Sequence, residues 1–184
     1  MITQGDRYIG GGILEFKKSG ETTWVEIGEI QEAKINMSVT FADAFSKDRV
    51  QKKLVEKVAK EINSTTSFST QKVNVHNLAM FLLGTESTEN YSIGDELPDG
   101  SIATEATTAV KIKAGDNPVI EGSLRFIGDE DGAKKPVILI HQAVITPSGD
   151  LPMIVDEFAN LSYEGAILET DDGFYDEYLM DVGA

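Results

Sequence analysis

The chain has 184 residues, 41% of them hydrophobic, and its 16 basic against 31 acidic residues give a formal charge of −15. The absence of cysteine excludes disulfides and thiolate metal sites, and no apolar run approaches the ~20 residues that a membrane-spanning helix needs. The acidic balance argues against direct attraction of the whole protein to nucleic acid. We expect a single domain over 1–184 with a sizeable core, and the N-terminus lacks the pattern of a signal peptide.

The first quarter of the chain predicts an arm followed by short strands. Residues 1–9 are expected to form a loose N-terminal arm. Strands are predicted over Ile13–Lys17 and Thr23–Ile27. Between Ile30 and Phe41 apolar and polar side chains alternate, which is typical of a half-buried strand.

Residues 42–62 fit two structures. Val50, Leu54, Val58 and Ile62 recur every four residues, which favours an amphipathic helix. From Ile62 onwards, however, the alternation is that of a strand. The alternative structure is a basic loop or hairpin over 42–60, with residues 50–58 paired to the following segment 61–71. The family resemblance given below favours this hairpin.

One helix is predicted, over Val75–Leu83. Asn74 is a suitable N-cap, the helix has a broad apolar face, and Gly84 is a suitable terminator. The polar residues 85–105 predict a loop or a loosely paired ribbon. Thr107–Lys113 is predicted to be the next strand.

An antiparallel meander is predicted over residues 119–168. Its strands are Glu121–Ile127 and Pro136–Ile145, followed by a turn at 147–150 that proline and glycine favour. Phe158–Leu168 is expected to make a final strand pair. Residues 169–184 form an acidic C-terminal arm, too acidic for a core strand and too aromatic for a purely disordered tail.

No enzymatic chemistry is predicted. The only histidines, His76 and His141, lie far apart in the sequence, and neither belongs to a metal-ligand pattern. His141 lies among apolar residues, which suggests a hydrogen-bonded core or interface histidine. No nucleophile–base pair is evident, so we assign no catalytic, cofactor-binding or metal-binding residues and expect no cofactor.

The charges are unevenly distributed. After Lys135 there is no basic residue, while ten acidic residues follow. This imbalance fits an ordinary solvated surface, and it also fits two halves of a self-complementary contact. Six basic residues gather in the segment 47–60: Lys47, Arg49, Lys52, Lys53, Lys57 and Lys60.

Several short stretches, in this order, resemble the major tail tube protein of long-tailed bacteriophages. They are Gly-Ile-Leu-Glu-Phe at 12–16, Thr-Trp-Val-Glu-Ile-Gly-Glu-Ile at 23–30, Asn-Leu-Ala at 77–79 before Leu-Gly at 83–84, Glu-Gly-Ser-Leu-Arg-Phe at 121–126, Val-Ile-Thr-Pro-Ser-Gly at 144–149, Asp-Glu-Phe at 156–158 and Gly-Ala-Ile-Leu at 165–168. The resemblance covers most of residues 10–170. It implies a mainly β fold, an antiparallel β-sandwich or barrel with one flanking helix at about 75–83.

The resemblance also implies a structural role in the virion. Such subunits form hexameric rings that stack into a hollow tail tube, through which genomic DNA passes without specific binding. The expected partners are other copies of the chain, a tape measure protein and a tail terminator, with assembly in the host cytoplasm and no membrane. Alternatives are a related ring-forming tube or terminator protein of the type VI secretion kind, and a β-sandwich binding or decoration module.

Two expectations follow for a tube. Strands from 30–41 and 54–71 are the leading candidates for a polar, acidic inner wall that repels DNA phosphates. The basic and acidic segments are expected to meet between stacked rings, with these contact candidates: Lys47, Arg49, Lys52, Lys53, Lys57, Lys60, Asp171, Asp172, Asp176 and Glu177.

Overall fold

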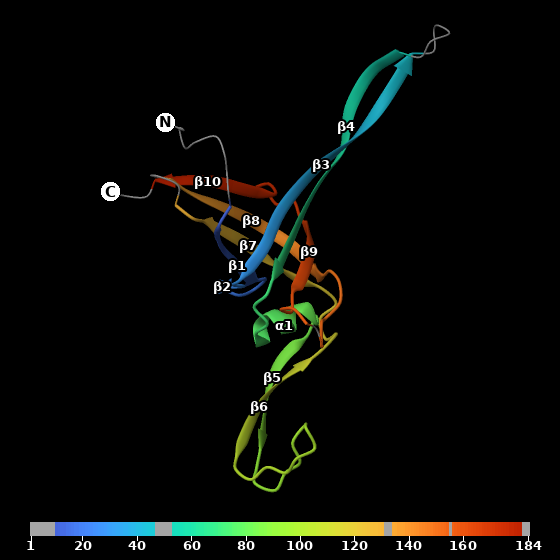
Figure 1. The fold of residues 1–184 in the computed structure, drawn as a ribbon. Helices are drawn as coiled ribbons and strands as arrows, with labels where there is room; N and C mark the ends of the chain where they lie inside the picture. The colour runs from blue at the N-terminus through green and yellow to red at the C-terminus, as the bar shows by residue number, and fades with distance from the viewer. Residues whose placement is uncertain (1–9, 47–52, 131–133, 155, 182–184) are drawn as a thin grey trace.

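The computed structural model describes residues 10–46, 53–130, 134–154 and 156–181. The fold is mainly β and antiparallel with one helix, as the sequence predicted. Its elements in chain order (Figure 1) are β1 Gly12–Lys18, β2 Val25–Glu26, β3 Ile30–Ser46, β4 Lys53–Thr70, α1 Val75–Phe81, β5 Thr85–Tyr91, β6 Thr107–Lys113, β7 Ile120–Gly128, β8 Lys134–Pro147, β9 Leu161–Ile167 and β10 Tyr175–Asp181.

Eight strands form one antiparallel sheet in the order β2-β1-β7-β8-β9-β4-β3, and β10 joins it beside β8. The sheet branches at β8, whose first half pairs with β10 and whose second half pairs with β9. One branch, the β1–β7–β8–β10 layer, faces the other branch, which is made of β9, β4 and β3. Side chains from both branches meet in one core.

A bulge in β8 keeps the buried side chains of β7 and β8 on the same face of the sheet. Gly122 lies opposite Ala143 while Leu124 lies opposite Ile140, so β8 carries one extra residue there. The hydroxyl of Ser123 donates to the carbonyl oxygen of His141 at 2.8 Å, which satisfies a backbone group inside the irregularity. As a result, buried residues continue on the inner face on both sides of the bulge.

Tyr163 on β9 lies at the centre of the core and is almost completely buried. Its ring stacks on Phe68 of β4 at a centroid distance of 4.8 Å and meets Phe81 of α1 edge-on at 5.7 Å. Its hydroxyl donates to the carbonyl oxygen of Asn77 at 2.8 Å. The aromatic ring thus joins the sheet to the helix, while its polar atom remains paired.

The helix begins as predicted and ends two residues earlier than expected. The side chain of Asn74 accepts a hydrogen bond from the backbone N–H of Asn77 at 2.7 Å. Leu82 is the C-cap, and Leu83 adopts a positive φ of 50°. At Gly84 a Cβ would lie 2.8 Å from the Lys113 carbonyl oxygen, so glycine permits the chain to pass close to β6.

The hairpin expected in 42–71 exists, but its predicted pairing is wrong. Residues 30–46 of β3 pair with 53–70 of β4, and two of the irregularities in this ladder are extra residues on β4 at Val55 and Lys60. The amphipathic helix is excluded over 53–62, which is strand. The turn, with Lys47, Arg49 and Lys52, lies outside the described residues.

Three further segments differ from expectation. Phe158–Leu168 holds a single strand, β9, because 158–160 precede it without pairing. Residues 85–91 form a regular strand, β5, that pairs with β6 in a separate hairpin. The C-terminal segment, expected to be an arm, contains β10, which is hydrogen-bonded to β8 along seven residue pairs. The acidic side chains of β10 are tolerated because it lies at an edge of the sheet.

Candidate assembly surfaces

The outer part of the β3–β4 hairpin is a two-stranded ribbon that extends away from the body (Figure 1). We call residues 36–46 and 53–63 the ribbon. Nearer the body, β9 pairs with β4 only over Ser64–Thr70. Among the described residues no third strand flanks the ribbon, so both of its faces and both of its edges face solvent.

The two faces of the ribbon differ in chemistry. In an antiparallel ladder, residues directly opposite each other share a face. One face carries Asn36, Ser38 and Thr40 opposite Thr65, Asn63 and Glu61. The other, which we call the apolar face, carries Met37, Val39, Phe41, Phe45, Leu54 and Ile62.

The apolar face continues the protein core into solvent. Ala33 and Ile35 precede its first residue on the same side of β3, and Ile35 packs against the buried cluster. Beyond them the six apolar side chains of this face are 40–53% exposed. A two-stranded hairpin is at best marginally stable alone in water, and a contiguous apolar surface of this kind marks a contact site. The ribbon is therefore a candidate contact surface.

A single charge pair interrupts the apolar face. Asp43 and Lys57 lie opposite each other across the two strands. The ammonium group of Lys57 lies 4.3 Å from the centroid of the Phe41 ring. This cation–π contact keeps the lysine stem along the ribbon and leaves its charge accessible.

A second apolar surface lies on the outer side of the β1–β7–β8–β10 layer. Register places Ile13, Ile127, Val137 and Tyr178 side by side across the four strands, and we call these four residues the outer row. Ile13 and Tyr178 at its ends are 45% and 47% exposed. Sequence reasoning missed this row, although the alternation of β1 and β8 already assigned Ile13 and Val137 to one face of each strand.

Charged side chains border the outer row. Arg125 forms an ion pair with Glu15 at 2.6 Å, and its guanidinium also lies 4.4 Å from the centroid of the Trp24 ring. Nε2 of His141 lies 3.5 Å from a carboxylate oxygen of Asp176. His141 is thus half-buried beside a carboxylate, and its Nε2 is buried without a hydrogen bond, so it is not the hydrogen-bonded core histidine that the sequence suggested.

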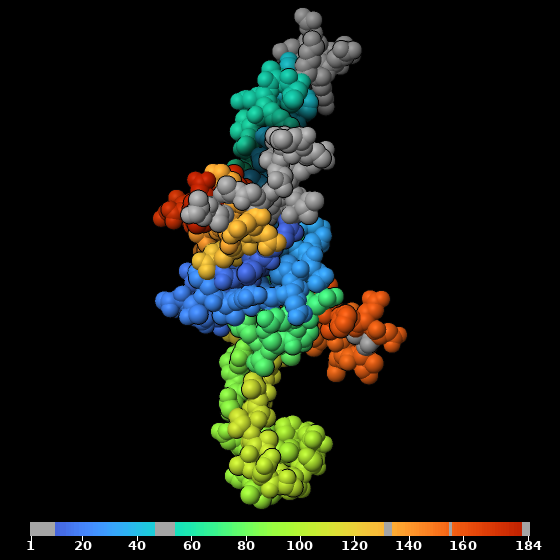
Figure 2. Space-filling model, turned by 60° about the vertical axis from the view of Figure 1, so that its left-hand side comes forward, coloured from blue at the N-terminus to red at the C-terminus, as the bar shows by residue number. Residues whose placement is uncertain are grey.

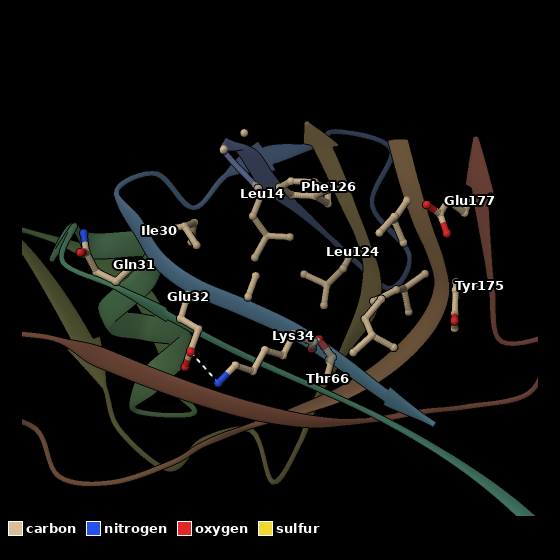
Figure 3. Close-up of a pocket in the computed structure, with 17 residues that line it drawn as sticks. Leu14, Ile30, Gln31, Glu32, Lys34, Thr66, Leu124, Phe126, Tyr175 and Glu177 are labelled. Atoms are coloured by element: carbon tan, nitrogen blue, oxygen red, sulfur yellow. Dashed lines mark hydrogen bonds and ion pairs between the residues drawn. The ribbon is translucent and has the colours of Figure 1, made fainter. Parts of the chain in front are cut away.

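The two branches of the sheet enclose a cavity of about 380 Å³ (Figure 3). Leu14, Leu124 and Phe126 line it from one branch, and Ile30 and Thr66 line it from the other. An ion pair between Lys34 and Glu32 at 2.5 Å lies at its rim. The lining is mostly aliphatic, without a nucleophile–base pair or a cluster of carboxylates.

A third apolar feature is the loop between β8 and β9, which protrudes from the body in Figure 2. Met153, Ile154 and Phe158 are 89%, 97% and 86% exposed. Single exposed apolar side chains are common on protein surfaces, but three such large ones on one loop are not.

The predicted charged contact residues are distributed over separate elements. Lys57 and Lys60 lie on the ribbon and Lys53 begins β4, whereas Lys47, Arg49 and Lys52 lie outside the described residues. Asp171 and Asp172 lie in the turn before β10, and Asp176 and Glu177 lie on β10. Within the described part of the chain, no ion pair joins the two groups.

Hydrogen bonding shifts the pKa values of several surface groups. The hydrogen bond from Tyr178 to Asp176 raises the pKa of the Tyr178 phenol. On the β5–β6 hairpin, hydrogen bonds from Lys111 and from Tyr91 lower the pKa of the Glu89 carboxyl. Inside the core, burial raises the pKa of Tyr163. None of these groups forms a catalytic arrangement with its neighbours.

His76 does not belong to a metal site in the described residues. Nδ1 of His76 lies 3.9 Å from a carboxylate oxygen of Glu86, at the junction of α1 and β5. Over the ranges that the structure describes, no group of three or more histidine, aspartate and glutamate side chains is placed to hold a metal ion. In the same ranges no helix is long and apolar enough to cross a membrane.

Comparison with known proteins returns no relative: no protein-family model and no curated protein matches this sequence. The apolar face, the outer row and the open strand edges are thus the features from which a function can be inferred.

Proposed function

We propose that this protein is a structural subunit that assembles into hexameric rings, and that the rings stack into the hollow tail tube of a long-tailed bacteriophage. The observation that carries the proposal is the ribbon, whose apolar face continues the core beyond the body and is left uncovered by the described residues. Self-association buries this face and also completes the ladder of a ribbon that is marginal alone.

Open strand edges support the same conclusion. In the described residues, β3 has a neighbour on only one side along its whole length, and so does β10. Long unpaired edges invite pairing with another chain, and proteins that remain monomeric usually block them. In a ring, each open strand edge can pair with an adjacent copy of the chain.

The polar side of the ribbon suits the inner wall of a conduit. Followed from the ribbon down to the body, the polar face has three acidic side chains in register, Glu32, Glu56 and Glu61. It has one described basic side chain in register, Lys34. A hexamer of a chain with charge −15 carries about −90, which repels the phosphates of DNA in the lumen. DNA then passes without adhering, as the resemblance to tail tube proteins implies.

The remaining parts of the proposal rest on that resemblance alone. A tape measure protein would set the tube length, a tail terminator would close its end, and assembly would take place in the host cytoplasm before incorporation into the virion.

Electron microscopy of negatively stained protein at increasing concentration tests the proposal. We expect long hollow filaments with six-fold end views. Single rings that never lengthen would favour the terminator alternative. A compact monomer at every concentration, measured by sedimentation, would favour a binding or decoration module and would contradict the tube.

A further inference from the structure

The described residues of the same subunit leave the apolar face of the ribbon uncovered. It continues the inner side of the sheet, as the shared orientation of Ile35 and Met37 on β3 requires. The outer row lies on the opposite side of the β1–β7–β8–β10 layer, because the inner side of those strands carries the buried Leu14 and Leu124. The two apolar surfaces of one chain therefore face the same way, so they cannot pack against each other within that chain.

These two surfaces are suited to each other in shape and chemistry. The outer row crosses four strands, or three inter-strand spacings, and is about 14 Å wide. The apolar face is a double row of alternating side chains on two strands. Stacked sheets pack face to face about 10 Å apart through such side chains.

Charges at the margins favour one arrangement. The outer row is bordered by Glu15 and Asp176, each of which already holds a cationic or ionisable partner on its own sheet. Lys57 on the apolar face has its ammonium exposed beside Phe41. Arg125 already neutralises Glu15 on this margin, whereas Asp176 has no lysine or arginine partner among the described residues. When the apolar residues of the ribbon lie on the row, the Lys57 ammonium can lie beside Asp176 instead of over an apolar side chain.

We propose that the apolar face of one copy docks on the outer row of the next copy. This inference rests on the self-assembly in the proposed function and names the two surfaces that carry it. The contact joins unlike surfaces, so each copy uses its ribbon once and its outer row once. Such head-to-tail contacts close into a ring or continue as a filament.

Cysteine cross-linking tests the contact directly, because the chain has no cysteine of its own. One preparation carries Val39→Cys on the apolar face, and the other carries Ile13→Cys or Tyr178→Cys on the outer row. The two are mixed, allowed to associate and oxidised. A disulfide needs Cβ atoms about 4 Å apart, so it reports facing residues.

Two matched controls use the same chemistry. Ser38→Cys lies one residue away on the polar face of the ribbon. Phe158→Cys lies on the protruding loop between β8 and β9, which is an alternative receptor for the ribbon. We expect Val39→Cys to cross-link to an outer-row cysteine at least tenfold more than Ser38→Cys does, and more than it does to Phe158→Cys.

The outcomes separate the contact from the tube. Rings or tubes without this preference, or with preferential linkage to Phe158→Cys, would overturn the contact and leave the proposed function in place. Specific cross-linking in assemblies that never become hollow tubes would support the contact and contradict the tail tube role. A mixture that remains monomeric and uncross-linked at high concentration would overturn both.

Discussion

At the scale of single residues, the buried asparagine Asn77 links three elements. Its side-chain amide donates to the carbonyl oxygens of Ile27 at 2.9 Å and Lys72 at 2.7 Å. Asn77→Ala leaves the buried Ile27 carbonyl and the part-buried Lys72 carbonyl without this donor, so we expect a loss of about 2–4 kcal/mol of unfolding free energy. The cap variant Asn74→Ala should lose only about 1 kcal/mol. Urea denaturation of the monomer measures both losses, and equal losses would contradict the special role of Asn77.

The contribution of Tyr163 to the unfolding free energy is expected to depend on pH. Burial raises its pKa in the folded state above the ordinary value of about 10. The neutral phenol therefore stabilises the fold below pH 10, and this stability is lost as the pH rises, because only the unfolded chain releases the proton readily. Tyr163→Phe removes the hydrogen bond to Asn77 and should cost about 1 kcal/mol at pH 7.

Above pH 10 this difference between the variant and the parent should shrink by up to about 1.4 kcal/mol per pH unit, because phenylalanine has no proton to lose. Denaturant titrations at pH 7, 10 and 11 measure the trend. A difference that is constant across this range would mean that Tyr163 ionises freely in the folded protein.

At the scale of elements, sequence patterns identified the strands better than their partners. The alternation of 30–41 predicted β3 correctly. In β4, the extra residues Val55 and Lys60 change the spacing of the apolar-face positions from two to three at two places. The two bulges place Leu54 and Ile62 on the same face, whereas Val58 lies opposite Ala42 on the other face, so the four-residue recurrence in 50–62 does not follow one face of the strand.

Local sequence patterns could not predict which distant strands pair or which side chains are exposed. The acidic composition of 175–181 argued against a core strand, but β10 needs only one partner because it lies at an edge. The candidate surfaces were recognisable only in part. The outer row depends on register among four strands distant in sequence, and no local pattern reports that register.

The ribbon gives an element-scale prediction that does not use cross-linking. Val39→Glu places a charge on the apolar face, and Ser38→Glu places the same charge on the polar face. Because both positions are exposed, each monomer should keep its stability within about 0.5 kcal/mol. Val39→Glu should abolish assembly because the carboxylate would be buried without a partner. Sedimentation and micrographs compare the two, and equal assembly would contradict a buried apolar face.

At the scale of the whole molecule, two hairpins extend from opposite ends of the body. The ribbon projects from one end and the β5–β6 hairpin from the other (Figures 1 and 2). The tip of the β5–β6 hairpin is acidic, with Asp95, Glu96 and Asp99 and no basic residue between 85 and 110. An elongated subunit with unlike ends is suited to polar stacking, in which one end of a ring meets the other end of the next.

The basic segment 47–60 then leads to a prediction about ring stacking. Its lysines are expected to contact acidic side chains of an adjacent ring. The sequence predicts that these acidic side chains belong to residues 150–181. Each exposed ion pair contributes only ~0–1 kcal/mol. Repetition around a ring multiplies this small term, and salt weakens it because screening is strong beyond ~8 Å at physiological ionic strength.

Reversing Lys52, Lys53 and Lys57 to glutamate should therefore block tube growth while the monomer remains folded. The corresponding glutamine variant, with half the change in charge, should give shorter tubes, and Lys18→Glu at the exposed end of β1 serves as a control for non-specific repulsion. Tube length from micrographs at low and high salt measures the effect. Because Lys57 also belongs to the proposed contact with the outer row, its reversal is expected to weaken ring formation as well as stacking in the glutamate variant. If that variant forms tubes as long as the parent at both salt concentrations, stacking does not depend on these charges and the basic segment is an ordinary solvated surface.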